Sequence, residues 1–406
     1  MPPYSPTWQY CNRIRQVNEP ARPQRDPLFT SPFLKLWTFN FITFFTAFQL
    51  FPTIPFRIID LGGSKAQAGL FLAAYTWASA ISAPLTGSIA DHIGRKRLLR
   101  ISSVAFVVFS AAYSFITHLP VLLVVACVHG LFWSGLLSAG GGLISDVIPL
   151  SRRTEGMAYW GLAPSLAISI SPPFGLMMYA YGWQVLCAGL VIMSILLLTM
   201  AGRLPDTHAR SELPFPSMKH IVDWPVLFSS MTLFTVSFGY GGITSFVAVM
   251  AADRALEPRS LFFTVSAAVI ILIRVFIAPI GDRIGPIRLL IPSLIVIPFA
   301  HLMLAHASSR TDIVIAGALF GLGVGGSYPG FISWILSRTD PARSAATFGS
   351  VLFAIDTGIG LGSLALGWII ETKGFTQAFY FAGVVATLAS PVFVFTSRIP
   401  RRQHRR

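Results

Sequence analysis

Three ionisable side chains stand inside long apolar stretches of this sequence: Asp356, Arg274 and His129. A charged group is costly in hydrocarbon, so an ionisable residue at such a position is a candidate for function. Asp356, in the segment 353–362, is the acid placed deepest within an apolar stretch. Its carboxyl group can bind and release a proton, or it can pair with a cationic substrate. The alternative is a structural carboxylate that pairs with a neighbour.

The other polar candidates also have more than one interpretation. Arg274 lies about two helical turns before Asp282 on roughly the same face, so it either pairs with Asp282 or binds an anionic group of a substrate. His129 can carry a proton near neutral pH, or it is a buried neutral histidine bonded to a backbone carbonyl. Gln49, deep in the first apolar stretch, is the candidate for a polar contact in a cavity.

The composition indicates what kind of element must position these residues. The chain has 406 residues, of which 54% are hydrophobic and 11% charged, and its mean hydropathy is +0.67. Soluble domains carry about 25% charged residues, so we predict an all-α polytopic membrane protein. The net charge of +14 does not indicate nucleic-acid binding, because the basic residues lie between apolar stretches. Three cysteines without paired spacing predict neither a disulfide framework nor a metal site.

Twelve stretches are long and apolar enough to span a bilayer as helices, which takes about 20 residues. They run over 34–57, 65–90, 98–117, 119–145, 155–180, 183–202, 226–251, 260–281, 287–307, 311–337, 344–370 and 375–397. Stretches three and four meet at His118 and stretches five and six at Tyr181-Gly182, so both links are predicted to be tight turns.

The polar segments divide these helices into two halves and orient them. The predicted organisation is a disordered basic cytoplasmic tail (1–32), an N-terminal six-helix bundle (33–202), a cytoplasmic linker (203–225), a C-terminal six-helix bundle (226–397) and a second basic cytoplasmic tail (398–406). Most of the 30 Lys and Arg residues fall on one side when both termini are placed in the cytoplasm, as the positive-inside rule requires.

A short motif occurs at the end of the second stretch and again, in degraded form, at the end of the eighth. Asp91 and Asp282, Gly94 and Gly285, and Arg97 and Arg288 share one sequence offset. Gly87 permits close helix contact and Gly94 a tight turn. An internal repeat in membrane helices predicts a transporter built from two halves around a central site.

The run from Gly87 through Asp91, His92 and Gly94 to Arg95-Lys96 resembles the signature motif of the major facilitator superfamily, with His92 in place of the usual basic residue. The resemblance implies twelve helices in two bundles related by pseudo-twofold symmetry. It also implies a conformational latch at the cytoplasmic side, formed by Gly87, Asp91, Gly94, Arg95, Lys96, Asp146, Asp282, Arg283 and Gly285. The alternative is that these residues are topology anchors and helix caps.

The position of Arg274 before the second motif resembles the pattern of the drug/proton-antiporter-like branch of this superfamily. The run Ser171-Pro172-Pro173-Phe174-Gly175 differs from that branch, because it lacks the paired glycines found there. The expected function is proton-coupled export of a small amphipathic drug or metabolite by alternating access. The alternative is uptake or facilitated diffusion of a small organic solute; a receptor or membrane enzyme is the competing class. We expect no cofactor, no bound metal, no nucleic-acid partner and no enzymatic activity. We expect a monomeric, proton-coupled protein in a bacterial cytoplasmic membrane.

Overall fold

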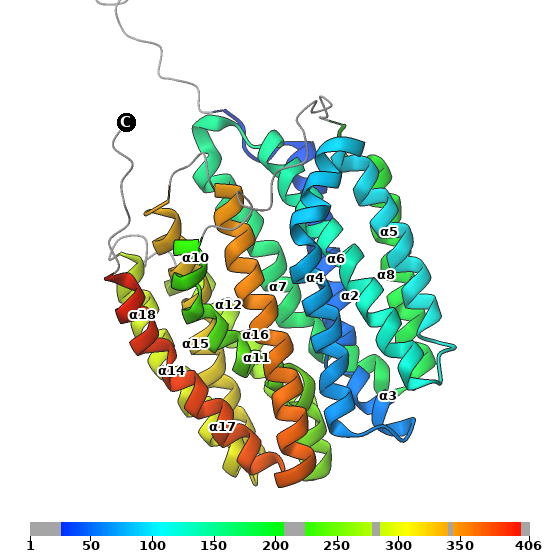
Figure 1. The fold of residues 1–406 in the computed structure, drawn as a ribbon, viewed down its shortest axis with the longest axis vertical. Coiled ribbons are helices and arrows are strands. Elements are labelled where there is room, and N and C mark those ends of the chain that lie inside the picture. Colours follow the sequence, from blue (N-terminus) through cyan, green and yellow to red (C-terminus); the bar gives the residue numbers. More distant parts are fainter. Residues whose placement is uncertain (1–25, 207–223, 278–284, 340–343, 399–406) are drawn as a thin grey trace, which may run out of the picture.

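The computed structural model describes residues 26–206, 224–277, 285–339 and 344–398. Within these residues every regular element is a helix. Figure 1 shows the helices running roughly along the long axis of the molecule in two groups that lie side by side. The N-terminal group consists of α2 to α8 and the C-terminal group of α10 to α18. This arrangement agrees with the all-α membrane fold expected from the composition.

The N-terminal group follows the first six apolar stretches. Its helices are α2 (Ser31–Leu50), α3 (Ile54–Asp60), α4 (Lys65–Ile93), α5 (Arg95–Ala112), α6 (Leu119–Val147), α7 (Arg153–Ala180) and α8 (Trp183–Arg203), with a 3₁₀ turn at Leu150–Arg152. The first stretch is divided into α2 and α3 around Pro52. The link between α5 and α6 spans residues 113–118, so it is longer than the tight turn expected at His118.

The C-terminal group follows the later stretches. Its elements are α10 (Trp224–Ser229), α11 (Met231–Asp253), α12 (Leu261–Leu272), the π-helix η2 (Ile273–Ile277), α14 (Pro286–His306), α15 (Arg310–Leu336), α16 (Ser344–Lys373), α17 (Phe375–Thr387) and α18 (Ala389–Ser397). Helix α17 is separated from α18 only at Leu388.

Nine described helices are long and apolar enough to cross a membrane, or ten if the bent α4 is included. Helix α4 bends by 55° between Lys65–Ala83 and Leu85–Ile93, where the sequence has a proline. The described part of the eighth stretch is the short α12 and its π-helical continuation. The expected total of twelve spans therefore stays a prediction.

Glycines with positive φ angles mark equivalent turns in the two groups. Gly94 (φ 98°) precedes α5, and its predicted repeat partner Gly285 (φ 94°) precedes α14. Gly182 (φ 115°) and Gly374 (φ 88°) likewise precede α8 and α17. An L side chain rarely adopts such a backbone, so glycine at both copies supports the internal repeat.

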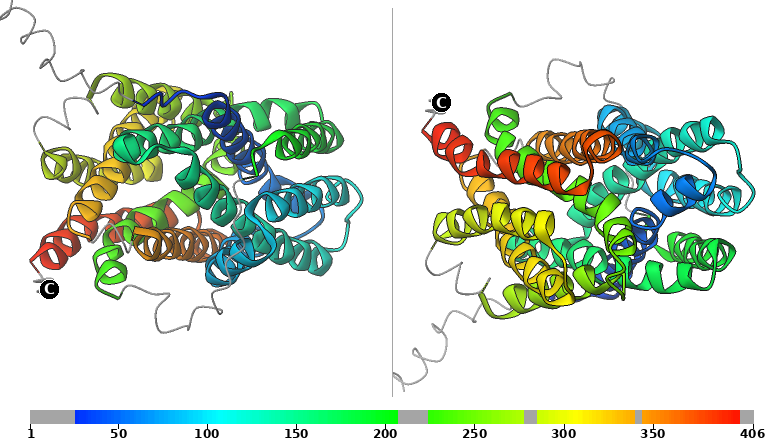
Figure 2. Two further views of the ribbon diagram at one scale, coloured as in Figure 1. Left: turned by 90° about the horizontal axis from the view of Figure 1, so that it is seen from above. Right: turned by 90° about the horizontal axis from the view of Figure 1, so that it is seen from below.

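The two groups meet mainly where α4 packs along α16 and α7 crosses α12, and Figure 2 shows α4 beside α16 in both views. We call the end that carries Arg95 and Arg152 the basic end and the other, which carries Lys65 and Glu371, the opposite end. A β-carbon at Gly69 would overlap the carbonyl oxygen of Ser363. One at Gly367 would lie 2.6 Å from the carbonyl oxygen of Lys65. Backbone contact at these glycines closes the groups tightly at the opposite end.

The same helices are looser toward the basic end. Among the described residues, no atom lies within 4 Å of a β-carbon built at Gly87 of α4 or at Gly349 of α16. Gly141 of α6 and Gly161 of α7 also have no described neighbour within this distance. Among the described residues the close contact expected at Gly87 is therefore not made, and their packing is tight at the opposite end and looser at the basic end.

Candidate functional site

Asp356 lies at the contact between the two groups. The Ser79 hydroxyl of α4 donates a hydrogen bond of 2.9 Å to Oδ2 of Asp356 on α16. Beside it, toward the opposite end, the Trp77 indole donates to the carbonyl of Thr357 over 3.4 Å. The carboxyl group predicted from the sequence is thus held by a hydroxyl from the other group of helices. Its partner must change whenever α4 moves against α16.

Two tyrosines interact electrostatically with Asp356, and Arg274 interacts with one of them. The charge of Asp356 acts on the hydroxyls of Tyr75 on α4 and Tyr328 on α15. Tyr328 also interacts electrostatically with Arg274, which lies in the π-helix η2. The Tyr75 hydroxyl is buried and has no hydrogen-bond partner among the described residues. We call Tyr75, Ser79, Arg274, Tyr328 and Asp356 the central polar cluster.

The expected latch residues of the N-terminal group converge at the basic end. Nη1 of Arg95 lies 2.5 Å from Oδ2 of Asp146 on α6, and Nη2 lies 3.3 Å from Oδ1 of Asp91 on α4. Nη1 also donates to the carbonyl of Gly142 over 2.8 Å. One guanidinium therefore ties together three helices whose residues are far apart in the sequence.

The position of Arg95 depends on a glycine that the sequence motif does not include. A β-carbon at Gly142 would lie 2.6 Å from Nε of Arg95, so a larger residue would displace the guanidinium. Burial opposes the positive charge, but the hydrogen bond and charge of Asp146, and then of Asp91, outweigh it and raise the pKa of Arg95. The basic group is thus firmly charged in this arrangement.

His129 lies inside the N-terminal group, where its ring packs against Tyr75 of the central polar cluster. Its Nδ1 is 3.1 Å from the Tyr113 hydroxyl, while its Nε2 is buried and has no hydrogen-bond partner. The rings of Tyr75, Phe106 and Phe109 pack around it. His129 is therefore bonded to a tyrosine rather than to a backbone carbonyl, and this aromatic enclosure favours a structural role.

The remaining candidates are dispersed. Gln49 is fully buried. The absence of a side chain at Gly175 of α7 leaves room for the backbone and β-carbon of Gln49. The side-chain amide of Gln49 donates to the carbonyl of Phe45. Its Oε1 is buried and has no hydrogen-bond partner among the described residues, and a contact with a cavity stays a prediction. Gly285 forms the turn described above, whereas Asp282 and Arg283 lie outside the described residues.

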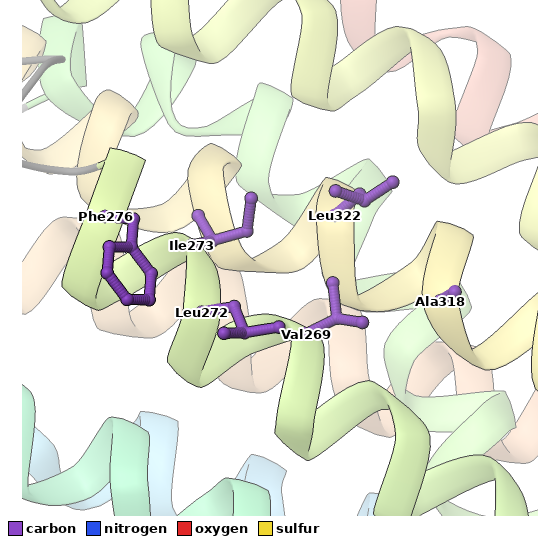
Figure 3. A pocket seen from close by; sticks show the side chains of 6 residues that line it. All are labelled: Val269, Leu272, Ile273, Phe276, Ala318 and Leu322. Atoms are coloured by element: carbon purple, nitrogen blue, oxygen red, sulfur yellow. The ribbon is translucent and has the colours of Figure 1, made fainter.

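A separate pocket of about 310 Å³ lies between α12 and α15 (Figure 3). Its lining side chains are all apolar: Val269, Leu272, Ile273, Phe276, Ala318 and Leu322. Leu272 is 54% and Phe276 64% exposed. Exposed apolar side chains on a membrane helix suit contact with lipid, so this pocket is not assigned to the central polar cluster.

Sequence reasoning missed two members of the cluster, Ser79 and Tyr328. A single serine in an apolar helix is common, and nothing near Ser79 distinguishes it. Tyr328 does carry a usable signal, since it stands in Gly325-Gly-Ser-Tyr-Pro-Gly330. Stretches interrupted by glycine and proline in membrane helices often line a binding site.

Comparisons with known proteins agree with this architecture. The chain is similar to the staphylopine export protein of Staphylococcus aureus, with 22% identity over 389 residues that cover 91% of this chain and 97% of that protein. It is 24% identical over 368 residues to the multi-drug resistance efflux pump PmrA of Streptococcus pneumoniae, which covers 85% of this chain and 90% of PmrA.

Among solved structures, the human organic anion transporter MFSD10 (TETRAN) has the same fold, with a TM-score of 0.69 and 15% identity over 89% of this chain and 98% of that one. The family model described as Major Facilitator Superfamily matches residues 36–297 and 230–406. These two matches together span nearly the whole sequence. The chain therefore belongs to the Major Facilitator Superfamily.

Proposed function

We propose that this protein is a secondary transporter that exports a small amphipathic organic compound by alternating access, driven by proton entry. The observation that carries the proposal is the hydrogen bond between Ser79 and Asp356, which joins a carboxyl group to the opposite group of helices. The names of two similar proteins, an export protein and an efflux pump, support the direction of transport. The two moving halves are residues 33–202 and 226–397, with twelve spans in all.

The orientation follows from the distribution of charge. Arg95, Arg100 and Arg152 lie at the basic end, and positive residues favour the cytoplasmic side. We place the basic end and both termini in the cytoplasm, in a bacterial cytoplasmic membrane, and expect a monomer. The described conformation then has its outer side closed and its inner side open.

The Ser79–Asp356 hydrogen bond links proton transfer to this alternation. A hydrogen bond donated to a carboxylate stabilises its ionised form. With the outer side closed, Ser79 donates to Asp356 and favours proton release toward the cytoplasm. Opening of the outer side separates α4 from α16, removes the donor and favours proton binding from outside. Each cycle then carries a proton inward while the substrate leaves.

Everted membrane vesicles with a pH-sensitive dye test this function. A panel of amphipathic compounds is added after a pH gradient has been established. At least one compound is expected to dissipate the gradient in vesicles that contain the protein and to leave it unchanged in vesicles without it. Compound movement that is independent of the gradient would instead indicate facilitated diffusion, and accumulation into right-side-out vesicles would indicate uptake.

The latch gives a further prediction. Arg95→Gln removes the charged contacts to Asp91 and Asp146. Charge-assisted hydrogen bonds contribute about 1.5–3 kcal/mol each, and these are discounted to about 1–2 kcal/mol because the groups are partly exposed. The transport rate is expected to fall about 5- to 30-fold, which is the factor that corresponds to this energy. Initial rates in the vesicle assay measure it.

Lys96→Gln is the matched control for this prediction: Lys96 belongs to the latch that the resemblance implies, but it forms no ion pair with any residue that the structure describes. It removes the same charge from the next position and is expected to keep most of the rate. Gly142→Leu should reproduce the Arg95→Gln defect with the charge still present, since it displaces the guanidinium. Equal rates for the Arg95 and Lys96 variants would show that the loop charges only anchor the topology.

A further inference from the structure

Arg274 is a largely shielded cation for which the described protein provides no counter-ion. Its Nε atom is sealed from solvent and has no hydrogen-bond partner. No described residue forms an ion pair or hydrogen bond with its guanidinium. A shielded charge is costly unless an opposite charge or an acceptor reaches it. A ligand that brings an anionic group would meet this requirement.

The π-helix determines which way Arg274 faces. Positions 269, 272, 273 and 276 line the apolar pocket on the outer face of this segment (Figure 3). Ile273 packs against α15, where a β-carbon at Gly325 would lie 3.2 Å from its side chain. Arg274 is absent from that pocket and interacts electrostatically with Tyr328. A π-helical turn within an α-helix frequently marks a functional position, and Arg274 lies in such a turn, with Tyr328 of α15 within electrostatic reach.

Arg274 and Tyr328 together offer the donors that a carboxylate needs. A guanidinium presents a planar fork that matches two carboxylate oxygens, and the phenol hydroxyl adds a third donor. Tyr328 is 37% exposed, while its hydroxyl lies deep in the protein. The Tyr328 hydroxyl also interacts electrostatically with Asp356, which supplies a negative charge to the same cluster. The cluster thus has a positive and a negative pole.

The direction of coupling decides what kind of substrate suits these two poles. A simple anion would neutralise Arg274 and thereby favour protonation of Asp356, so anion and proton would bind together and move in the same direction. Export against proton entry requires substrate and proton to compete for Asp356. A positively charged group on the substrate competes in this way, while a carboxylate on the same molecule pairs with Arg274.

We propose that Arg274 and Tyr328 bind the carboxylate of an amino-carboxylate zwitterion whose ammonium group pairs with Asp356. The inference rests on the proposed function, because it takes Asp356 as the proton site of an exporter. It adds the charge pattern of the substrate. Tyr75 and Ser79 are the other polar groups that face Asp356, and neither carries a charge that would replace the ammonium group.

Three probes that differ only in charge test the proposal in the everted vesicles: 4-(aminomethyl)benzoate, 4-methylbenzylamine and 4-methylbenzoate. The wild type is expected to respond to the zwitterion with a lower KM than to the amine, and not to the acid. Arg274→Gln should raise the KM for the zwitterion about 10- to 100-fold, the range expected for one charged hydrogen-bonded contact. Tyr328→Phe should raise it less.

The amine response serves as the test of folding. Arg274→Gln is expected to keep the response to 4-methylbenzylamine, which has no carboxylate to lose. Arg310→Gln, which removes an exposed charge from the start of α15, should leave all responses unchanged. Equal losses for zwitterion and amine in Arg274→Gln would overturn the proposal. So would wild-type vesicles that export other compounds of the panel and ignore the zwitterion. Wild-type vesicles that respond to no compound would contradict the export function itself.

Discussion

Asp356→Asn is expected to reduce proton-driven transport to the level of vesicles that lack the protein. Asparagine has nearly the same shape and can still accept the hydrogen bond from Ser79, so the contact between α4 and α16 is retained. It cannot exchange a proton at physiological pH, and the cycle loses the step that couples it to the gradient. Dye-monitored proton movement in everted vesicles measures this effect.

Asp206→Asn is the matched control for this variant. Asp206 is an exposed acid after α8, and its replacement removes the same charge from a position outside the cluster. This control is expected to keep the wild-type rate. If Asp356→Asn retained full proton movement, the coupling group would have to be sought elsewhere, with His129 as the next candidate despite its aromatic enclosure.

Ser79→Ala separates the role of the hydrogen bond from that of the carboxyl group. It removes a donor that stabilises the ionised carboxylate in the described conformation. Proton release then requires a higher pH, so the pH profile of transport is expected to move to higher pH by about one unit, since about 1.4 kcal/mol corresponds to one unit. Ser79→Thr keeps the hydroxyl and should restore the profile. An unchanged profile in Ser79→Ala would show that this bond has no part in coupling.

Two separate substitutions of a glycine in α4 by leucine are expected to trap the transporter in opposite conformations. The two glycines lie on either side of the bend in α4, Gly69 in Lys65–Ala83 and Gly87 in Leu85–Ile93. In the described conformation Gly69 contacts the backbone of α16, whereas Gly87 has no described neighbour within 4 Å. Gly69→Leu should therefore prevent closure of the opposite end. Gly87→Leu fits the present conformation and should prevent closure of the basic end.

Overpacking of a tight contact costs about 1–3 kcal/mol, which shifts the balance between the two conformations about 5- to 100-fold. Transport should be severely reduced in both variants. Distances between spin labels at the exposed positions Arg97 and Arg288 report on the basic end, and labels at Phe115 and Lys373 report on the opposite end. The labels are placed in a chain whose three cysteines have been replaced.

In Gly69→Leu the distance at the opposite end should lengthen and that at the basic end should shorten. In Gly87→Leu both distances should keep the values of the described conformation. Gly202→Leu, at an exposed glycine near the end of α8 without a close neighbour among the described residues, is the control and should transport normally. Identical distances in the two α4 variants would contradict the assignment of a closed and an open end.

The sequence alone determined the class of protein and much of its framework. Low charge and long apolar stretches predict membrane helices because the bilayer leaves no other partner for backbone polar groups. The motif around Asp91 and Arg95 and its repeat indicated the family, which the family match confirms. The repeat partners Gly94 and Gly285 also have the same positive φ conformation. Local rules suffice here, because helix length and turn geometry depend on residues close together in the chain.

Only the tertiary structure decided which polar residues meet. A helix in a membrane is apolar on its lipid face and on much of its inner face, so its sequence carries no amphipathic pattern that shows which side is inward. Ser79 and Asp356 are separated by 277 residues, and no local pattern pairs them. For the same reason the sequence does not show that Gln49 packs at Gly175. The face of Arg274 depends on a π-helical turn, which a regular 3.6-residue period does not predict.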